Sequence, residues 1–139
     1  EFGATVVMGD AIFDLDMDIY VPCALGATVN PSTISRLKCE IIAGAANNQL
    51  ANEERDAQLC ADKGICYTPD FLINAGGLIN VYSELKGYNR QEALDQTRKI
   101  YDTTLEILHK ADLDNITTHV AALDIAQQKI NETKMSNAQ

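Results

Sequence analysis

Short apolar runs alternate with helical segments across the first half of this 139-residue chain, and this alternation constrains the fold more than any other feature. We expect strands at residues 5–8, 18–21, 40–43, 65–68 and 71–73. The runs are apolar at successive positions, which is typical of strands covered on both faces. Short buried strands that alternate with helices predict an α/β fold built around a parallel sheet.

The helices between these runs have recognisable starts and ends. Asn30 followed by Pro31 predicts a helix start, because Asn caps free N–H groups and proline fits the first helical position. We expect this helix to extend to about Lys38. A second helix is expected over residues 52–63, where Gly64 supplies the residue type that most often follows a helix.

The second half of the chain predicts only helices. A helix over residues 75–85 would be closed by Gly87, and Asn89 with Glu92 three residues later resembles a capped helix start. The helix after this start carries an apolar stripe with a period of about 3.6 residues. The stripe consists of Ala93, Leu94, Thr97, Ile100, Tyr101, Thr104, Leu105 and Leu108.

A last helix is expected to start at Thr117 or Thr118. Its apolar face consists of Ala121, Ala122, Ile125, Ala126 and Ile130. The polar end of the chain is expected to fray. We therefore divide the chain into half of a parallel α/β sheet at residues 1–86, terminal helices at residues 87–133 and a tail at residues 134–139.

The charge of the chain limits its partners. A formal net charge of −9 without a basic patch disfavours binding to nucleic acids and to anionic membranes. No stretch approaches the roughly 18 uninterrupted apolar residues of a membrane span. We therefore expect a small molecule or a second copy of the chain as partner, with no nucleic acid and no membrane.

The four cysteines form no Cys-x-x-Cys pair, and the chain has only two histidines, so zinc-site spacing is absent. We interpret the cysteines as reduced, mostly buried thiols of a cytoplasmic protein, and His109 and His119 as surface or interface residues. The chain opens without a signal peptide or an initiator Met, beside a strand-like run. We therefore expect it to be part of a longer polypeptide.

Small residues and amides follow three of the expected strands, at residues 22–27, 44–50 and 74–77. Gly76 and Gly77 lack the Cβ atoms that would hold a flat ligand away from the backbone, and Asn74 adds an amide donor and acceptor. Because ligands bind at the carboxyl ends of parallel strands, Asn74 and the pair Asn47-Asn48 predict one shared site. Such a lining suits a neutral, polar, flat group such as a carboxamide. Tight turns with capping asparagines are the alternative.

Two other chemistries have weaker support. Cys23 stands at a strand end, where a nucleophile could lie, but no histidine is near it in sequence. Asp14, Asp16 and Asp18 could bind a hard cation, but they alternate with apolar residues, which favours a solvated strand edge. The dinucleotide fingerprint Gly-x-Gly-x-x-Gly is absent.

Three long motifs, at residues 21–27, 43–50 and 69–81, occur in the order and at the spacings of a known enzyme family. On these motifs the chain resembles the C-terminal part of the NAD-dependent amino-acid dehydrogenases of the leucine, valine, phenylalanine and tryptophan branch. The resemblance covers nearly the whole chain. It implies that residues 1–86 are the C-terminal half of a Rossmann-like NAD-binding domain. The helices of residues 87–133 would pack back toward an N-terminal domain.

The resemblance implies an oxidative deamination, in which an L-amino acid becomes a 2-oxo acid and ammonia while NAD is reduced. In such enzymes a lysine pair and an aspartate of the N-terminal domain bind the carboxylate and carry the proton transfers. That domain has no counterpart here. The resemblance therefore implies no catalytic residue and no metal ligand within this chain, and the segment alone is expected to be inactive.

The binding residues implied by the resemblance fall into two groups. Those that would contact the cofactor at the nicotinamide, the ribose or the carboxamide are Cys23, Ala24, Leu25, Asn47 and Asn74. Asn48 would hold the substrate carboxylate. Leu78 and Val81 would form one wall of the pocket for the amino-acid side chain, since positions three apart share a helix face.

The substrate is left open between two classes. Leucine or another branched-chain amino acid is the default, and an aromatic substrate, tryptophan or phenylalanine, is the alternative that Leu78 favours. Glutamate is disfavoured because no basic residue lies near Leu78 and Val81. The family also implies a homo-oligomer. A hypothesis of another class is a non-catalytic nucleotide-binding or assembly module.

Overall fold

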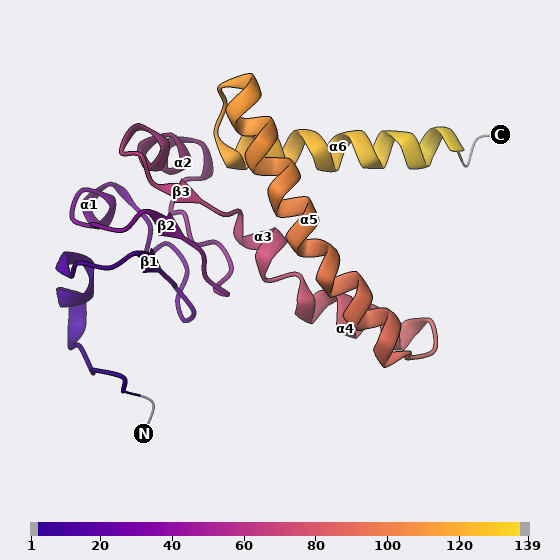
Figure 1. Cartoon of the computed structure of the whole chain (residues 1–139), viewed down its shortest axis with the longest axis horizontal. Coiled ribbons are helices and arrows are strands. Elements are labelled where there is room, and N and C mark those ends of the chain that lie inside the picture. Colours follow the sequence, from indigo (N-terminus) through magenta and orange to yellow (C-terminus); the bar gives the residue numbers. More distant parts are fainter. Residues whose placement is uncertain (1–2, 137–139) are drawn as a thin grey trace.

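A small parallel sheet with its helices forms one part of the molecule, and helices form the rest (Figure 1). The structure is a computed structural model and describes residues 3–136. Its elements are a 3-10 helix (Gly9–Asp14), β1 (Ile19–Tyr20), α1 (Pro31–Ile34), β2 (Ile41–Ile42), α2 (Glu53–Asp62), β3 (Cys66–Tyr67), α3 (Asp70–Ile73), α4 (Gly76–Leu85), α5 (Arg90–Asp114) and α6 (Thr118–Ser136). The strand order is β1-β2-β3 and both pairings are parallel, so the expected α/β fold is confirmed.

One face of the sheet is buried beneath α1 and α2. Tyr20, Ile42 and Tyr67 are neighbours in register, and all three side chains belong to the main hydrophobic core. The same core includes Ile34, Leu37, Ala57 and Cys60. Because right-handed crossovers between strands added in one direction carry their helices on one side, α1 and α2 share this face.

The opposite face of the sheet is less well covered. Ile19 of β1 is 48% exposed, whereas Ile41 and Cys66 beside it are half-buried. The expectation that the strands are covered on both faces is therefore wrong for β1. Both crossover helices lie on the other side, so none of them can cover this strand.

Two of the expected strands are absent from the described part of the chain. Residues 5–8 are irregular, and Val6 and Met8 are exposed, because the run has no neighbouring strand with which to pair. Residues 71–73 belong to helix α3 instead of a strand. Asp70 is the first residue of this helix, and its Oδ1 accepts the N–H of Phe71 at 2.6 Å.

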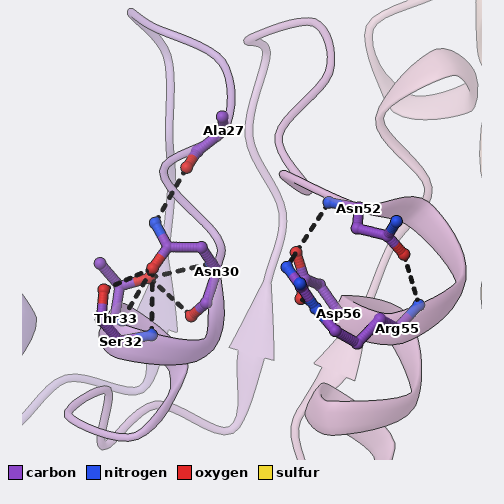
Figure 2. Close-up of polar contacts among 7 residues, drawn as sticks. All are labelled: Ala27, Asn30, Ser32, Thr33, Asn52, Arg55 and Asp56. Atoms are coloured by element: carbon purple, nitrogen blue, oxygen red, sulfur yellow. Dashed lines mark hydrogen bonds and ion pairs between the residues drawn. The ribbon is translucent and has the colours of Figure 1, made fainter.

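Helix α1 has the predicted start but ends early. The Asn30 side chain accepts the N–H groups of Ser32 and Thr33, and the Thr33 hydroxyl accepts the N–H of Asn30 (Figure 2). The helix ends at Ile34 instead of continuing to Lys38. The Lys63 Nζ donates to the carbonyls of Ile34 and Leu37 at 2.5 and 2.6 Å, which satisfies acceptors that the early end of the helix leaves free.

Helix α2 is capped at both ends, of which the sequence predicted only the glycine that follows it. The Asn52 side chain accepts the N–H of Arg55 at 2.9 Å, and the buried Asp56 accepts the N–H of Asn52 at 2.8 Å (Figure 2). The helix is followed by Gly64 in the left-handed conformation, with φ +76°. These reciprocal bonds fix the start of α2.

The terminal helices dock on the sheet part through α6. The Thr118 hydroxyl donates to the carbonyl of Tyr67, so the start of α6 bonds the outer strand β3. A second, small core joins α5 to α6, with members Ile107, Ala111, Ala121, Ala122 and Ile125. Beyond this core α6 extends away from the sheet (Figure 1). It stays helical to Ser136, past the point where the tail was expected to begin, and residues 137–139 lie outside the described part.

The expected apolar stripe of α5 is only partly covered. Ala93 is buried, and four further members are half-buried: Thr97, Ile100, Thr104 and Leu108. Leu94, Tyr101 and Leu105 are exposed, and the buried Ile107 was not part of the predicted stripe. No helix within residues 3–136 combines the length and the apolarity that crossing a bilayer would require. The division into residues 1–86, 87–133 and 134–139 stays a prediction.

We predict that the isolated chain self-associates, because the exposed apolar surface of α5 gains from burial. Light scattering should give a mass above the 15.2 kDa of one chain. The double variant Tyr101→Lys, Leu105→Lys should lower that mass, since both side chains are exposed on α5. A single 15.2 kDa species for the unchanged chain would contradict the prediction.

Candidate functional site

The loops that follow β1 and β2 are joined by backbone hydrogen bonds. The N–H of Ala27 donates to the carbonyl of Asn48 at 2.7 Å, and the N–H of Val29 donates to the carbonyl of Gln49 at 2.9 Å. The N–H of Ala51 donates back to the carbonyl of Val29 at 2.9 Å. The loops that contain the predicted cofactor residues therefore lie against each other at the carboxyl edge of the sheet.

Glycines allow these two loops to approach. A Cβ on Gly44 would lie 2.1 Å from the carbonyl oxygen of Pro22, and a Cβ on Gly26 would lie 2.9 Å from the carbonyl oxygens of Asn47 and Asn48. These glycines are therefore required by contact between the loops. At Gly77, by contrast, an added Cβ would meet nothing within 4 Å, so this glycine leaves open space beside α4.

The side-chain amides of Asn47 and Asn74, which the sequence predicted to share a site, are hydrogen-bonded to each other. The Asn74 Nδ2 donates to Asn47 Oδ1 at 2.6 Å, which joins the loop after β2 to the segment after β3. Asn47 is exposed and Asn74 is half-buried. Within residues 3–136, Asn47 Nδ2 and Asn74 Oδ1 have no hydrogen-bond partner. The pair thus presents one donor and one acceptor to its surroundings.

Asn48 follows the pair in a conformation that few residues adopt. Its φ of +52° is left-handed, which asparagine tolerates better than most side chains. Its carbonyl is held by Ala27, whereas its side chain is exposed. The backbone therefore fixes the position from which the Asn48 amide projects, and its role as a substrate ligand stays a prediction.

The predicted residues of the first loop are at the surface. Cys23, Ala24 and Leu25 are all exposed, and Leu25 retains 76% of its surface. No hydrogen bond in the described part of the chain joins Cys23 to a histidine. His109 is exposed on α5, and His119 is buried on α6. Nothing in the described part of the chain supports a Cys–His nucleophile. The prediction of a surface or interface histidine agrees with the exposed His109 but is wrong for His119, which is buried within the chain.

Leu78 and Val81 lie on one exposed side of α4. Leu78 is 73% exposed and Val81 is 60% exposed, and Tyr82 and Leu85 extend the same apolar side by a further turn. Ile79 and Ser83 are half-buried on the side toward α5, which runs beside α4 (Figure 1). The prediction that Leu78 and Val81 share a helix face is confirmed. Their contact with a substrate stays a prediction.

Two buried polar residues of the site were missed from the sequence. Gln49 is fully buried and Asp70 is 9% exposed, and the N–H of Gln49 donates to Asp70 Oδ2 at 2.8 Å. The sequence signal for Asp70 was its place after Pro69 at a helix start, which the expected strand at residues 71–73 concealed. Gln49 gave no signal, because only its burial distinguishes it from a surface amide.

The contacts of His119 were also missed from the sequence, since the residue is buried between helices. Its Nε2 lies 3.6 Å from Glu53 Oε2 of α2, and its ring meets the ring of Phe71 edge to face, with centroids 6.0 Å apart. These contacts join α6 to both α2 and α3. His119 therefore holds the terminal helices against the sheet part.

The acidic cluster near β1 is paired with cations from the protein itself. Asp14 bonds Arg36 at 2.7 Å, and this bond lowers the pKa of Asp14, while Asp16 lies 3.1 Å from Lys38. Among residues 3–136 no group of three or more His, Cys, Asp or Glu side chains could hold a metal ion. The two ion pairs agree with a solvated edge, and the absence of metal ligands stays a prediction.

The four cysteines are all free. Cys39 and Cys60 are buried, Cys66 is half-buried and Cys23 is exposed. Burial raises the pKa of Cys60 to about 12, and it also raises the pKa of Cys39 and Cys66. These three thiols are therefore structural rather than reactive.

The chain is similar in sequence to known dehydrogenases over nearly its whole length. The model of the Glutamate/Leucine/Phenylalanine/Valine dehydrogenase family matches residues 2–137. Over 137 residues the chain is 52% identical to an L-tryptophan dehydrogenase of Nostoc punctiforme, which covers 99% of this chain and 39% of that protein. Over 130 residues it is 50% identical to a leucine dehydrogenase of Thermoactinomyces intermedius, which covers 94% of this chain and 35% of that protein.

The fold shows the same similarity. The crystal structure of L-tryptophan dehydrogenase from Nostoc punctiforme matches with a TM-score of 0.93 at 52% identity, over 96% of this chain and 40% of that one. The chain thus spans less than half of the length of these relatives.

We predict that Gly44→Ala destabilises the chain by about 3 kcal/mol or more, because its Cβ would overlap a backbone carbonyl that cannot rotate away. Gly77→Ala is the matched control, since the same methyl group enters open space within helix α4. Its stability should be unchanged or higher by up to about 1 kcal/mol. Thermal unfolding followed by circular dichroism compares the two, and equal melting temperatures would contradict the packing argument.

Proposed function

Because the chain belongs to the Glutamate/Leucine/Phenylalanine/Valine dehydrogenase family, we propose that it forms the nicotinamide and side-chain part of an NAD-dependent amino-acid dehydrogenase. The observation that carries the proposal is the Asn47–Asn74 amide pair at the carboxyl edge of the parallel sheet. This edge is where open α/β sheets bind their ligands. The reaction would convert an apolar L-amino acid, NAD⁺ and water into a 2-oxo acid, ammonium, NADH and a proton.

The amide pair fits the cofactor by its hydrogen-bonding groups. Its outward donor, Asn47 Nδ2, and outward acceptor, Asn74 Oδ1, complement the oxygen and the NH₂ of a carboxamide, or two ribose hydroxyls. The chemistry that NAD supplies when bound is acceptance of a hydride from the α-carbon of the amino acid. Asn47 and Asn74 would orient its nicotinamide end, and the exposed backbone of residues 23–25 would lie along the ribose.

Asn48 would bind the substrate. Its side chain projects from the backbone next to Asn47, and its Nδ2 can donate to a carboxylate oxygen without adding charge. This chain contributes no proposed proton carrier. The longer relatives leave more than half of their length unmatched by this chain, and we assign the proton transfers to the corresponding part of the longer protein.

The exposed side of α4 would select the substrate. Leu78 and Val81 offer an apolar surface and no charge, which suits a hydrocarbon side chain. We propose leucine or another branched-chain amino acid as substrate. An aromatic amino acid is the second candidate, supported by the 52% identity to the Nostoc tryptophan dehydrogenase. A single methylene discriminates by only about 1–3 kcal/mol, so related substrates should compete.

We further propose a cytoplasmic homo-oligomer. The four free thiols suit a reducing compartment, and the exposed apolar residues of α5 suit contact with a partner surface.

Two chimeras test the proposal. In each, this chain replaces the matching segment of the Nostoc tryptophan dehydrogenase or of the Thermoactinomyces leucine dehydrogenase. Leu78→Ala should lower kcat/KM for the preferred amino acid by about tenfold or more, because it removes one apolar wall. Leu113→Ala removes a similarly exposed leucine from the far end of α5 and should leave kcat/KM unchanged. Unchanged kinetics for every amino acid in Leu78→Ala would contradict the assignment of the wall.

The cofactor assignment has its own test in the same chimeras. Asn47→Ala should raise the KM for NAD by about three- to tenfold, the value of one to two hydrogen bonds. Asn131→Ala, an exposed asparagine of α6, is the control and should leave this KM unchanged. An unaltered KM for NAD in Asn47→Ala would remove the amide pair from the cofactor site.

The second class of function, a nucleotide-binding or assembly module, makes a different prediction. We expect the isolated chain to bind NADH more weakly than about 1 mM, because its sequence lacks a glycine-rich pyrophosphate turn. Calorimetric titration of the chain with NADH measures this directly. Micromolar binding would favour the module over the dehydrogenase segment.

A further inference from the structure

We propose that Asp70 and Gln49 are positioning residues for the cofactor amides, and that their buried hydrogen bonds set where Asn47 and Asn74 stand. This inference rests on the proposed function, in which the amide pair orients the nicotinamide end. In this proposal two buried residues affect cofactor binding only through the amides that they position.

Asp70 connects two segments through its carboxylate. Oδ2 accepts the N–H of Gln49 at 2.8 Å, and Oδ1 accepts the N–H of Phe71 at 2.6 Å. The side chain is buried, so these two donors replace solvent around the charge. One carboxylate thereby ties the loop after β2 to the start of α3.

The backbone of Asp70 reaches the second amide. Its carbonyl accepts the N–H of Asn74 at 3.0 Å, one helical turn further along the chain. Asp70 is thus bonded to Asn74 directly and to Gln49, which stands two positions after Asn47. The 2.6 Å bond between Asn74 and Asn47 completes this hydrogen-bonded ring of residues on the solvent side.

Gln49 shapes the loop from inside. Its Nε2 donates to the carbonyl of Gly44 at 2.6 Å and to the carbonyl of Ala46 at 2.9 Å. These bonds use both hydrogens of its amide and fold residues 44–49 back on themselves. Asn47 lies within this closed loop, so the buried Gln49 side chain helps to fix its position.

The chemistry of the contact requires a carboxylate at Asp70. A carboxylate accepts from two N–H groups at once, whereas the amide that Asp70→Asn introduces has the same shape but would turn its NH₂ toward one of them. One of the two N–H groups, the buried one of Gln49 or the partly buried one of Phe71, would then be left without this acceptor. Asp70→Asn is the test variant because it keeps the shape of the side chain and removes one hydrogen-bond acceptor.

The experiment is a double-mutant cycle in the Nostoc chimera, read as the Kd for NADH from fluorescence titration. Asp70→Asn and Asn47→Ala should each weaken NADH binding, by about three- to tenfold. If Asp70 acts through Asn47, the double variant should bind NADH no more than about twofold more weakly than Asn47→Ala alone. Multiplied effects, or unchanged binding in Asp70→Asn, would overturn the inference.

Two further variants separate positioning from mere stability. Asp56→Asn is the matched control, because Asp56 is a buried carboxylate that accepts a backbone N–H at the start of α2. It should lower the melting temperature and leave NADH binding unchanged. Gln49→Met removes both side-chain donors at similar length, and should weaken NADH binding as Asp70→Asn does. Equal loss of NADH binding in Asp56→Asn would overturn the positioning role.

The proposed function fails separately. A folded chimera that does not bind NADH, or one in which Asn47→Ala leaves binding unchanged, would remove the cofactor site and the positioning role with it. Weakened binding in Asn47→Ala with unchanged binding in Asp70→Asn would overturn only the positioning role.

Discussion

The close approach of two loop backbones at Gly44 and Pro22 supports the rest of the site. Because Gly44 has no Cβ, the loops after β1 and β2 lie close enough for the N–H groups of Ala27 and Val29 to bond carbonyls of the second loop. Those bonds place Asn48 in its left-handed conformation and present Asn47 at the carboxyl edge. A ligand site built on backbone contact has little freedom to rearrange, which suits the orientation of a flat group.

The polar groups of this edge are amides rather than charges. Asn47 and Asn74 satisfy each other with one bond and keep one donor and one acceptor available. The charged group that organises them, Asp70, is buried one layer below and is bonded to backbone N–H groups. The buried carboxylate thus bonds the backbone beneath the amide pair, while the outward groups are neutral and would recognise a ligand by its hydrogen-bond pattern.

The exposed apolar residues fall on surfaces that a larger assembly would use. Leu78 and Val81 face outward from α4, and Ile19 lies on the open face of β1. The chain covers less than half of its dehydrogenase relatives, so a part equivalent to their remaining length would have these surfaces available. Helix α6, held at its start by Thr118 and His119, extends from the sheet part with its far half exposed.

The sequence by itself determined the local structure and the family. The capped starts at Asn30 and Asn89 follow from interactions within a few residues, which the order of residue types encodes directly. The parallel sheet was predicted from the alternation of strand-like runs with helices, although its pairings join distant segments. Only the tertiary structure decided that residues 71–73 form a helix, and that Asp70 links two loops. Such contacts join segments far apart in the chain, and their strength depends on burial, which the residue types alone do not specify.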